Sequence, residues 1–152
     1  MKVKLYKLIK IKKGLLGEIT SIKKKIHSNN TVVLPGEHIY NINELMDKYD
    51  KLIQQIVNVK KVLFENTMPI YPKIFEISEL KSKILFLNKL STKNGKVSEK
   101  RSYTNAIDVN EYKSIIGQNE KDQMIVELNK KITKLQDEID EYNYSTIVEI
   151  NL

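Results

Sequence analysis

The chain has 152 residues, of which 41% are hydrophobic and 30% are charged, and its formal net charge at pH 7 is +7. This length allows one domain with a continuous core, and we expect residues 1–152 to form a single domain. The sequence has no cysteine and two histidines, His27 and His38, which argues against a disulfide framework, a thiolate nucleophile and a Cys- or His-based metal centre. We therefore predict that the protein is not an enzyme and holds no cofactor.

The basic charge is distributed unevenly. Residues 1–28 and 67–105 are basic, whereas residues 106–152 are acidic. This alternation suits oppositely charged helices that pair with one another as well as it suits an anionic ligand. Arg101 is the one arginine among 26 basic residues, which weakens a sequence-specific DNA interpretation, because such recognition relies on the arginine fork.

No run approaches the roughly 18 apolar residues of a membrane-spanning helix. Lysines interrupt each apolar run near the N-terminus, so we expect no signal-peptide core. A cytoplasmic location is the resulting prediction.

Residues 2–28 are predicted to form the first helix. Its apolar face follows a heptad rhythm and consists of Leu5, Leu8, Leu15, Ile19, Ile22 and Ile26. Gly14 and Gly17 each cost about 1 kcal/mol relative to alanine inside a helix, so they mark a weak or closely packed spot, or a kink. The alternative for this segment is a basic amphipathic helix that lies on a membrane surface.

Residues 29–41 are predicted to form an extended loop, with a short extended piece at 31–34 and a turn at Pro35-Gly36. We expect His38 in this loop to be solvated or locally hydrogen-bonded. Asn41 and Glu44 have the spacing of a capping box, which places the start of the next helix at about Ile42.

The second helix, residues 42–65, has the clearest pattern in the chain. Seven apolar side chains follow at steps of three and four residues, which is typical of the seam between paired helices: Ile42, Leu45, Tyr49, Leu52, Ile56, Val59 and Leu63. Met46, Ile53 and Val57 form a second apolar flank, so this helix is expected to touch two neighbours.

Pro69 is predicted to end the second helix and Pro72 to open the third, residues 72–90. The third helix carries an apolar face of Ile74, Ile77, Leu80, Ile84 and Leu87. The remaining apolar residues are expected to fill the space around that face: Phe75, Leu85, Phe86 and Leu90.

Residues 91–107 form the most polar stretch and are predicted to be a mobile loop, with a short strand near 103–109. Asn94-Gly95 favours a hairpin turn, but its flanks are polar. A basic, aromatic-bearing cluster lies here, and we take its members as candidate contacts for a phosphate or an acidic partner, against the alternative of an ordinary solvated loop: Lys93, Lys96, Lys100, Arg101 and Tyr103.

The fourth helix is predicted at residues 109–142, opened by a capping box of Asp108 and Glu111. Its later half repeats the three-four rhythm, whereas the stripe lapses near Gly117, where we expect a break. The β-branched tail, residues 143–148, is predicted to fold back over the end of the bundle.

The order of these features resembles the septicolysin-like family of small bacterial helical proteins. The resemblance runs over nearly the whole chain and rests on Asn30-Thr31-Val32, Gly36-Glu37, Asn43-Glu44-Leu45, Asn66-Thr67, Arg101-Ser102-Tyr103, Ile107-Asp108-Val109 and Asn143-Tyr144-Ser145-Thr146. The family typically has Asn-Trp-Thr-Thr in the last motif, from which Tyr144 and Ser145 depart. The resemblance marks Asn66, Thr67, Asp108, Asn143, Tyr144 and Thr146 as family-motif positions. Its name implies an oxygen-labile, membrane-active toxin, whereas this chain lacks the cysteine that such a toxin would need.

The sequence thus predicts an all-α protein, an antiparallel bundle of about four long helices with coiled-coil-like packing and two extended loops. The function we expect is that of a non-catalytic interaction or assembly protein that forms homo-oligomers and binds an unidentified protein partner. Two alternatives stay open: a membrane-active toxin, and a nucleic-acid binder that uses the basic N-terminal helix and the loop around residues 93–103.

Overall fold

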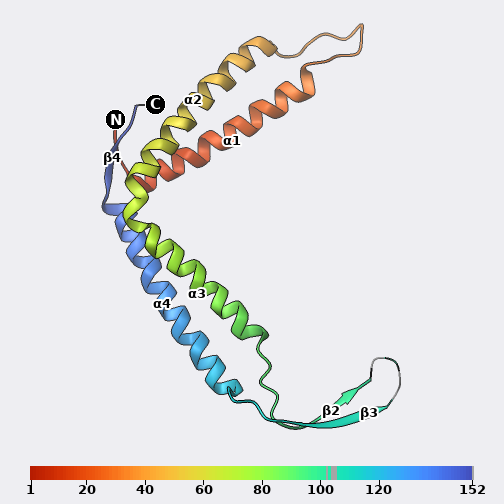
Figure 1. Cartoon of the computed structure of the whole chain (residues 1–152). Coiled ribbons are helices and arrows are strands. Elements are labelled where there is room, and N and C mark those ends of the chain that lie inside the picture. Colours follow the sequence, from red (N-terminus) through yellow and green to blue (C-terminus); the bar gives the residue numbers. More distant parts are fainter. Residues whose placement is uncertain (102, 104–105, 152) are drawn as a thin grey trace. The chain divides into compact units, whose positions relative to one another are not determined.

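The computed structural model describes residues 1–101, 103 and 106–151, and these are mostly helical, as predicted (Figure 1). The elements in chain order are β1 (Lys2–Lys4), α1 (Leu5–Asn29), α2 (Ile42–Thr67), the 3₁₀ helix η1 (Met68–Ile70), α3 (Tyr71–Lys89), β2 (Gly95–Lys100), β3 (Ile107–Tyr112), α4 (Gln118–Ser145) and β4 (Ile147–Glu149). The chain divides into two compact units, unit 1 (Met1–Tyr71 with Asp140–Leu152) and unit 2 (Pro72–Ile139).

The predicted four-helix bundle is wrong. The helices pair two by two: α1 lies along α2 in unit 1, and α3 lies along α4 in unit 2 (Figure 1). The reason lies between α2 and α3, where η1 leads from one helix to the next without a loop. Pro69 stands at the start of this 3₁₀ turn, where its missing N–H is tolerated, so the chain enters α3 without an intervening loop.

The core of unit 1 lies between α1 and α2 and consists of two apolar clusters. One gathers Leu5, Leu8, Val59, Leu63, Val148 and Ile150, and the other gathers Ile19, Ile22, Leu52 and Ile56. These residues come from the heptad faces predicted for residues 2–28 and 42–65, with two added from the C-terminal tail. The seam of the second helix is therefore confirmed, with α1 as the element that covers it.

The two ends of unit 1 form a small antiparallel sheet. Strand β1 pairs with β4 in the register Lys2 to Glu149 and Lys4 to Ile147, and the Met1 amine donates to the Ile150 carbonyl at 2.6 Å. The tail does fold back, but as a strand, and α4 extends three residues beyond its predicted end at 142, to Ser145. Because residues 2–4 belong to this sheet, α1 begins at Leu5 instead of residue 2.

The start of α2 and the loop before it agree with the sequence in part. The Asn41 side chain accepts from the Glu44 amide at 3.3 Å, so the predicted N-cap is confirmed, while the Glu44 carboxylate accepts from the Asn41 side-chain amide at 2.8 Å instead of from its backbone N–H. In the loop, His38 Nδ1 lies 2.8 Å from the Asn29 carbonyl oxygen, which is the expected local hydrogen bond.

The two glycines of α1 have open space beside them. A Cβ added at Gly14 or Gly17 would meet nothing within 4 Å, so neither glycine marks a closely packed spot.

Unit 2 has a much smaller buried core. Its antiparallel helices are joined by ion pairs of Lys73 with Glu138 at 2.6 Å and of Lys131 with Glu76 at 2.5 Å. At the other end of the pair, the Lys121 ammonium donates to the Leu90 carbonyl at 3.3 Å. The buried side chains of the unit, within the part that the structure describes, are Ile77, Leu87, Lys121 and Ile139.

The predicted loop at 91–107 and the predicted start of the fourth helix both need correction. Strands β2 and β3 form an antiparallel hairpin, with Gly95 opposite Tyr112 and Lys100 opposite Ile107. Gly95 therefore begins β2, and Asn94-Gly95 does not form the hairpin turn. Strand β3 occupies the residues at which we predicted the start of a helix, at 109. Helix α4 begins only at Gln118, immediately after Gly117, where we predicted a break. Residues 102, 104 and 105, which belong to the predicted loop, lie outside the described residues, and so does Ser102 of the family motif.

Candidate functional site

The candidate cluster predicted from the sequence lies on and beside the β2–β3 hairpin. Side chains of a strand point alternately to its two faces. The strand register thus places Glu99 and Asp108 directly opposite each other on one face, while Lys96 and Lys100 belong to the other face. The five predicted contacts are therefore divided between two faces of the hairpin and do not form one patch.

Two of the predicted cations are bound to carboxylates of the hairpin. Two like charges directly opposite each other destabilise a strand pair. Each of the two acids has its own cation: the Lys93 ammonium binds the Glu99 carboxylate, and Arg101 Nε donates to the Asp108 carboxylate at 2.6 Å. Lys93 and Arg101 thus offset the repulsion between Glu99 and Asp108, which is a structural role.

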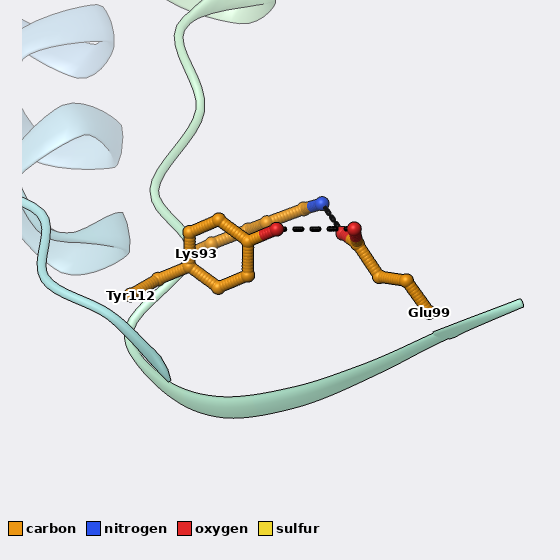
Figure 2. Close-up of polar contacts among 3 residues, drawn as sticks. All are labelled: Lys93, Glu99 and Tyr112. Carbon is orange, nitrogen blue, oxygen red and sulfur yellow. Dashed lines mark hydrogen bonds and ion pairs between the residues drawn. The ribbon is translucent and has the colours of Figure 1, made fainter. Parts of the chain in front are cut away.

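Figure 2 shows that Tyr112 completes the contact around Glu99. The Tyr112 hydroxyl donates to the second carboxylate oxygen of Glu99 at 3.0 Å. The Lys93 ammonium lies 5.0 Å from the centre of the Tyr112 ring, within the range of a cation–π contact. One carboxylate therefore receives a hydrogen bond at each oxygen, and its two donors also touch each other.

The protonation of this group follows from these contacts. The hydrogen bond from Lys93, reinforced by that from Tyr112, holds the pKa of Glu99 below its ordinary value. The same bond to Glu99 raises the pKa of Lys93. Both groups stay charged near neutral pH, so this site stabilises an ion pair and does not hold a proton ready for transfer.

The opposite face of the hairpin carries most of the exposed side chains of the two strands. Lys96 and Lys100 are exposed there, beside the exposed side chains of Ile107 and Val109. Tyr103, in the connection between the strands, is 99% exposed. Glu111 stands directly opposite Lys96 on this face, so its charges are mixed, and such a surface with apolar side chains between the charges suits a protein partner.

The family-motif positions have structural contacts. The side chains of Asn66 and Thr67 bond back to the Val62 and Leu63 carbonyls, and the Tyr142 hydroxyl donates to the Asn66 carbonyl at 2.9 Å. The Tyr144 ring stacks on Tyr6, and the Thr146 carbonyl accepts from the Leu5 amide at 2.9 Å.

Two family-motif positions remain. Asp108 serves the hairpin as the partner of Arg101. The side-chain amide oxygen of Asn143, Oδ1, is buried without a hydrogen bond.

Sequence reasoning missed a second basic group in unit 2. Lys83 of α3 and Lys130, Lys131 and Lys134 of α4 line one shallow hollow, together with Glu120 and Glu127. Their spacing of three and four residues along α4 could have indicated it. Lys130 and Lys131 pair with Glu127 and Glu76, so two of these four lysines are neutralised within unit 2.

Comparisons with known proteins give no parallel: no family model, no curated protein and no solved structure matches the chain. The resemblance to the septicolysin-like family thus stays a prediction. Over residues 1–101, 103 and 106–151, no group of three His, Asp or Glu residues is placed to hold a metal ion. The helices in this part of the chain are also too short or too polar to cross a membrane.

Proposed function

We propose that this protein is a non-catalytic helical interaction module that associates with itself and presents its hairpin to a protein partner. The observation that carries the proposal is the exposed apolar surface of α2 and of α3, outside the faces that pair within each unit. On α2 this surface lies beside the α1 seam, about a quarter turn around the helix, and its members are substantially exposed, with Val57 and Phe64 each at 60%: Met46, Ile53, Val57 and Phe64. Exposed apolar residues that gather on one side of a helix are typical of an interaction site.

The β2–β3 hairpin supports the second half of the proposal. An isolated two-stranded hairpin is marginally stable in water, and this one keeps Tyr103, Ile107 and Val109 exposed. The face with Glu99 and Asp108 is held by their ion pairs, which leaves the face with Ile107 and Val109 for a partner. A partner that covers the face with Ile107 and Val109 would bury apolar surface and stabilise the strands.

The test of self-association is a mass measurement. Sedimentation velocity and light scattering over a range from low micromolar to submillimolar protein should give a mass above the 17.7 kDa of one chain, rising with concentration. A mass of one chain throughout that range would contradict the proposal.

The toxin and nucleic-acid alternatives remain predictions with assays of their own. Leakage of anionic vesicles that is lost in Leu8→Glu would support a membrane role, although Leu8 is fully buried in the core of unit 1 and its variant needs a folding control. Salt-dependent retention on DNA that weakens in Lys96→Glu/Lys100→Glu would support nucleic-acid binding. Arg101→Glu serves that assay poorly, because it also breaks the pair with Asp108.

A further inference from the structure

Helix α3 has an inner face, defined by its contacts with α4. Lys73 and Glu76 pair with residues of α4, and Ile77 and Leu87 are buried. Leu80 and Ile84, which share this side of the helix, are half-buried. The inner face is therefore satisfied within unit 2.

The opposite side of α3 is apolar as well. At 100° per residue, six residues share a sector centred about 180° away from the inner face, and we call them the outer face: Ile74, Phe75, Ser78, Ser82, Leu85 and Phe86. Phe75 is 64% exposed, and Leu85 and Phe86 are each 63% exposed. The charged side chain of α3 on that sector is Lys89, which lies beyond Phe86 at the C-terminal end of the helix. A helix that is apolar on both sides is characteristic of a buried position, so this face calls for a cover.

We propose that the outer face of α3 pairs with the outer face of α3 in a second copy of the chain, with the two helices antiparallel. The inference rests on the self-association proposed above and specifies its surface. Its main support is that the outer face repeats in mirrored order, with large apolar residues at both ends and serines in the middle. A surface that meets itself across a two-fold axis must be complementary to itself in this way.

The register follows from helix geometry. In an antiparallel pair related by a two-fold axis, side chains on the same edge meet, so the pair centred on residue 80 places Ile74 against Leu85 of the second copy and Phe75 against Phe86 of the second copy. Ser78 then lies opposite Ser82 of the second copy, where small side chains let the helices approach closely. A parallel pair would instead bring Lys89, which lies on the same sector, against itself.

The charged residues at the two edges of the outer face distinguish an antiparallel pair of α3 helices from a parallel pair. On one edge, Glu79 comes near Lys83 of the second copy, which is attractive. On the other edge, Lys81 comes near Lys81 of the second copy, which is repulsive, so Lys81→Gln strengthens an antiparallel pair. In a parallel pair, Lys81 would face Glu79 of the second copy, and the same change would weaken association.

The first experiment compares two phenylalanines of nearly equal exposure by sedimentation velocity of the full chain. Phe86→Glu places a charge in the proposed interface, whereas Phe64→Glu places one on the exposed flank of α2. We expect the wild type and Phe64→Glu to give the mass of two chains and Phe86→Glu to give half of it, with unchanged helix content by circular dichroism. A dimer that survives Phe86→Glu but not Phe64→Glu overturns this inference while leaving self-association intact. A monomeric wild type overturns both.

The second experiment tests the direction of the helices by disulfide cross-linking, which is clean because the chain has no cysteine of its own. We expect a mixture of Ser78→Cys and Ser82→Cys to oxidise to covalent dimers severalfold faster than either variant alone. Faster cross-linking within each single variant would mean a parallel pair and would overturn the proposal. Phe86→Glu added to both variants should abolish the rate difference.

Discussion

The two units solve the problem of holding a helix pair together in different ways. In unit 1, α1 and α2 bury two apolar clusters along their seam, and the terminal strands cover one of them. In unit 2, α3 and α4 bury Ile77, Leu87 and Ile139 and rely on ion pairs at Lys73 and Lys131 for the rest. Partly exposed ion pairs contribute little to stability, so unit 2 is expected to be the weaker of the two by itself.

The difference teaches that a stripe of leucine and isoleucine shows which face of a helix must be buried. The neighbouring elements decide how much of that face is buried. The apolar stripe of α2 is covered by α1 and, at one end, by Val148 and Ile150 of the C-terminal tail. The stripe of α3 is met by one helix, and its outer face is left exposed. The predictions below test this contrast, from the largest expected effect to the smallest.

A buried leucine should matter more in unit 1 than in unit 2. Leu8 is fully buried and Leu87 is 2% exposed, so the two are matched in type and burial. We expect Leu8→Ala to lower the free energy of unfolding by about 3 kcal/mol and Leu87→Ala by about 2 kcal/mol, because a sparse helix pair collapses around a cavity more easily than a layered core. Urea unfolding curves measure both. Equal losses would show that the two units are packed alike.

The hydrogen bond from Tyr142 to the Asn66 carbonyl is a polar contact of unit 1 that can be removed alone. Tyr142→Phe keeps the ring that packs against the apolar cluster and deletes the 2.9 Å bond. We expect a loss of about 1 kcal/mol, since a partly buried carbonyl is left without its donor. Thermal unfolding followed by circular dichroism measures it. Tyr144→Phe, on a more exposed tyrosine, is the control and should change little.

Two glycines should respond to alanine with opposite signs. Gly14 lies inside α1 with open space around its added Cβ, so Gly14→Ala should raise stability by about 0.5–1 kcal/mol. Gly95, at the start of β2, has a φ of 79°, which strains any residue with a Cβ. Gly95→Ala should therefore destabilise the hairpin by about 1 kcal/mol. The first change is read from the unfolding curve and the second from amide exchange in residues 95–100.

The smallest effect is expected in the acid range at the hairpin. Because the pKa of Glu99 is lowered in the folded state by its bond with Lys93, the stabilisation is complete above the ordinary glutamate value of 4.5 and is lost as the pH falls through the lowered value. Cross-strand contacts seen by NMR should therefore weaken below pH 4.5. In Glu99→Gln they should be weaker at neutral pH and lose this acid dependence. Glu111→Gln, on the other face of the hairpin, should keep it.

The sequence predicted single helices far better than their pairing. The three-four rhythm from Leu45 to Leu63 identified the buried face of α2, and the Asn41 capping box located its start, because both signals lie within one helix. The connections between the helices decide which two apolar faces pack against each other. At Met68–Ile70, a 3₁₀ turn replaced the predicted stop, and each helix pairs within its own unit, α2 with α1 and α3 with α4.

The hairpin could not be predicted for a related reason. Val109, Tyr112 and Ile116 are spaced as on a helix, while the pairing of Glu99 with Asp108 depends on contacts that only the strand register creates. The same register divided the predicted basic cluster between two faces. The residue types of the candidate site were visible in the sequence, whereas their internal neutralisation was not.

The unbroken passage from α2 through η1 into α3 has a practical consequence. Both crossings between the units, at residue 71 and at residue 140, fall within helices, so a protease that needs extended backbone finds no exposed linker there. Limited digestion should instead cut the connection at residues 30–41, where Val33, Leu34 and Ile39 are at least 80% exposed. The fragments should stay associated after such a cut, since α1 and α2 hold each other through their buried seam.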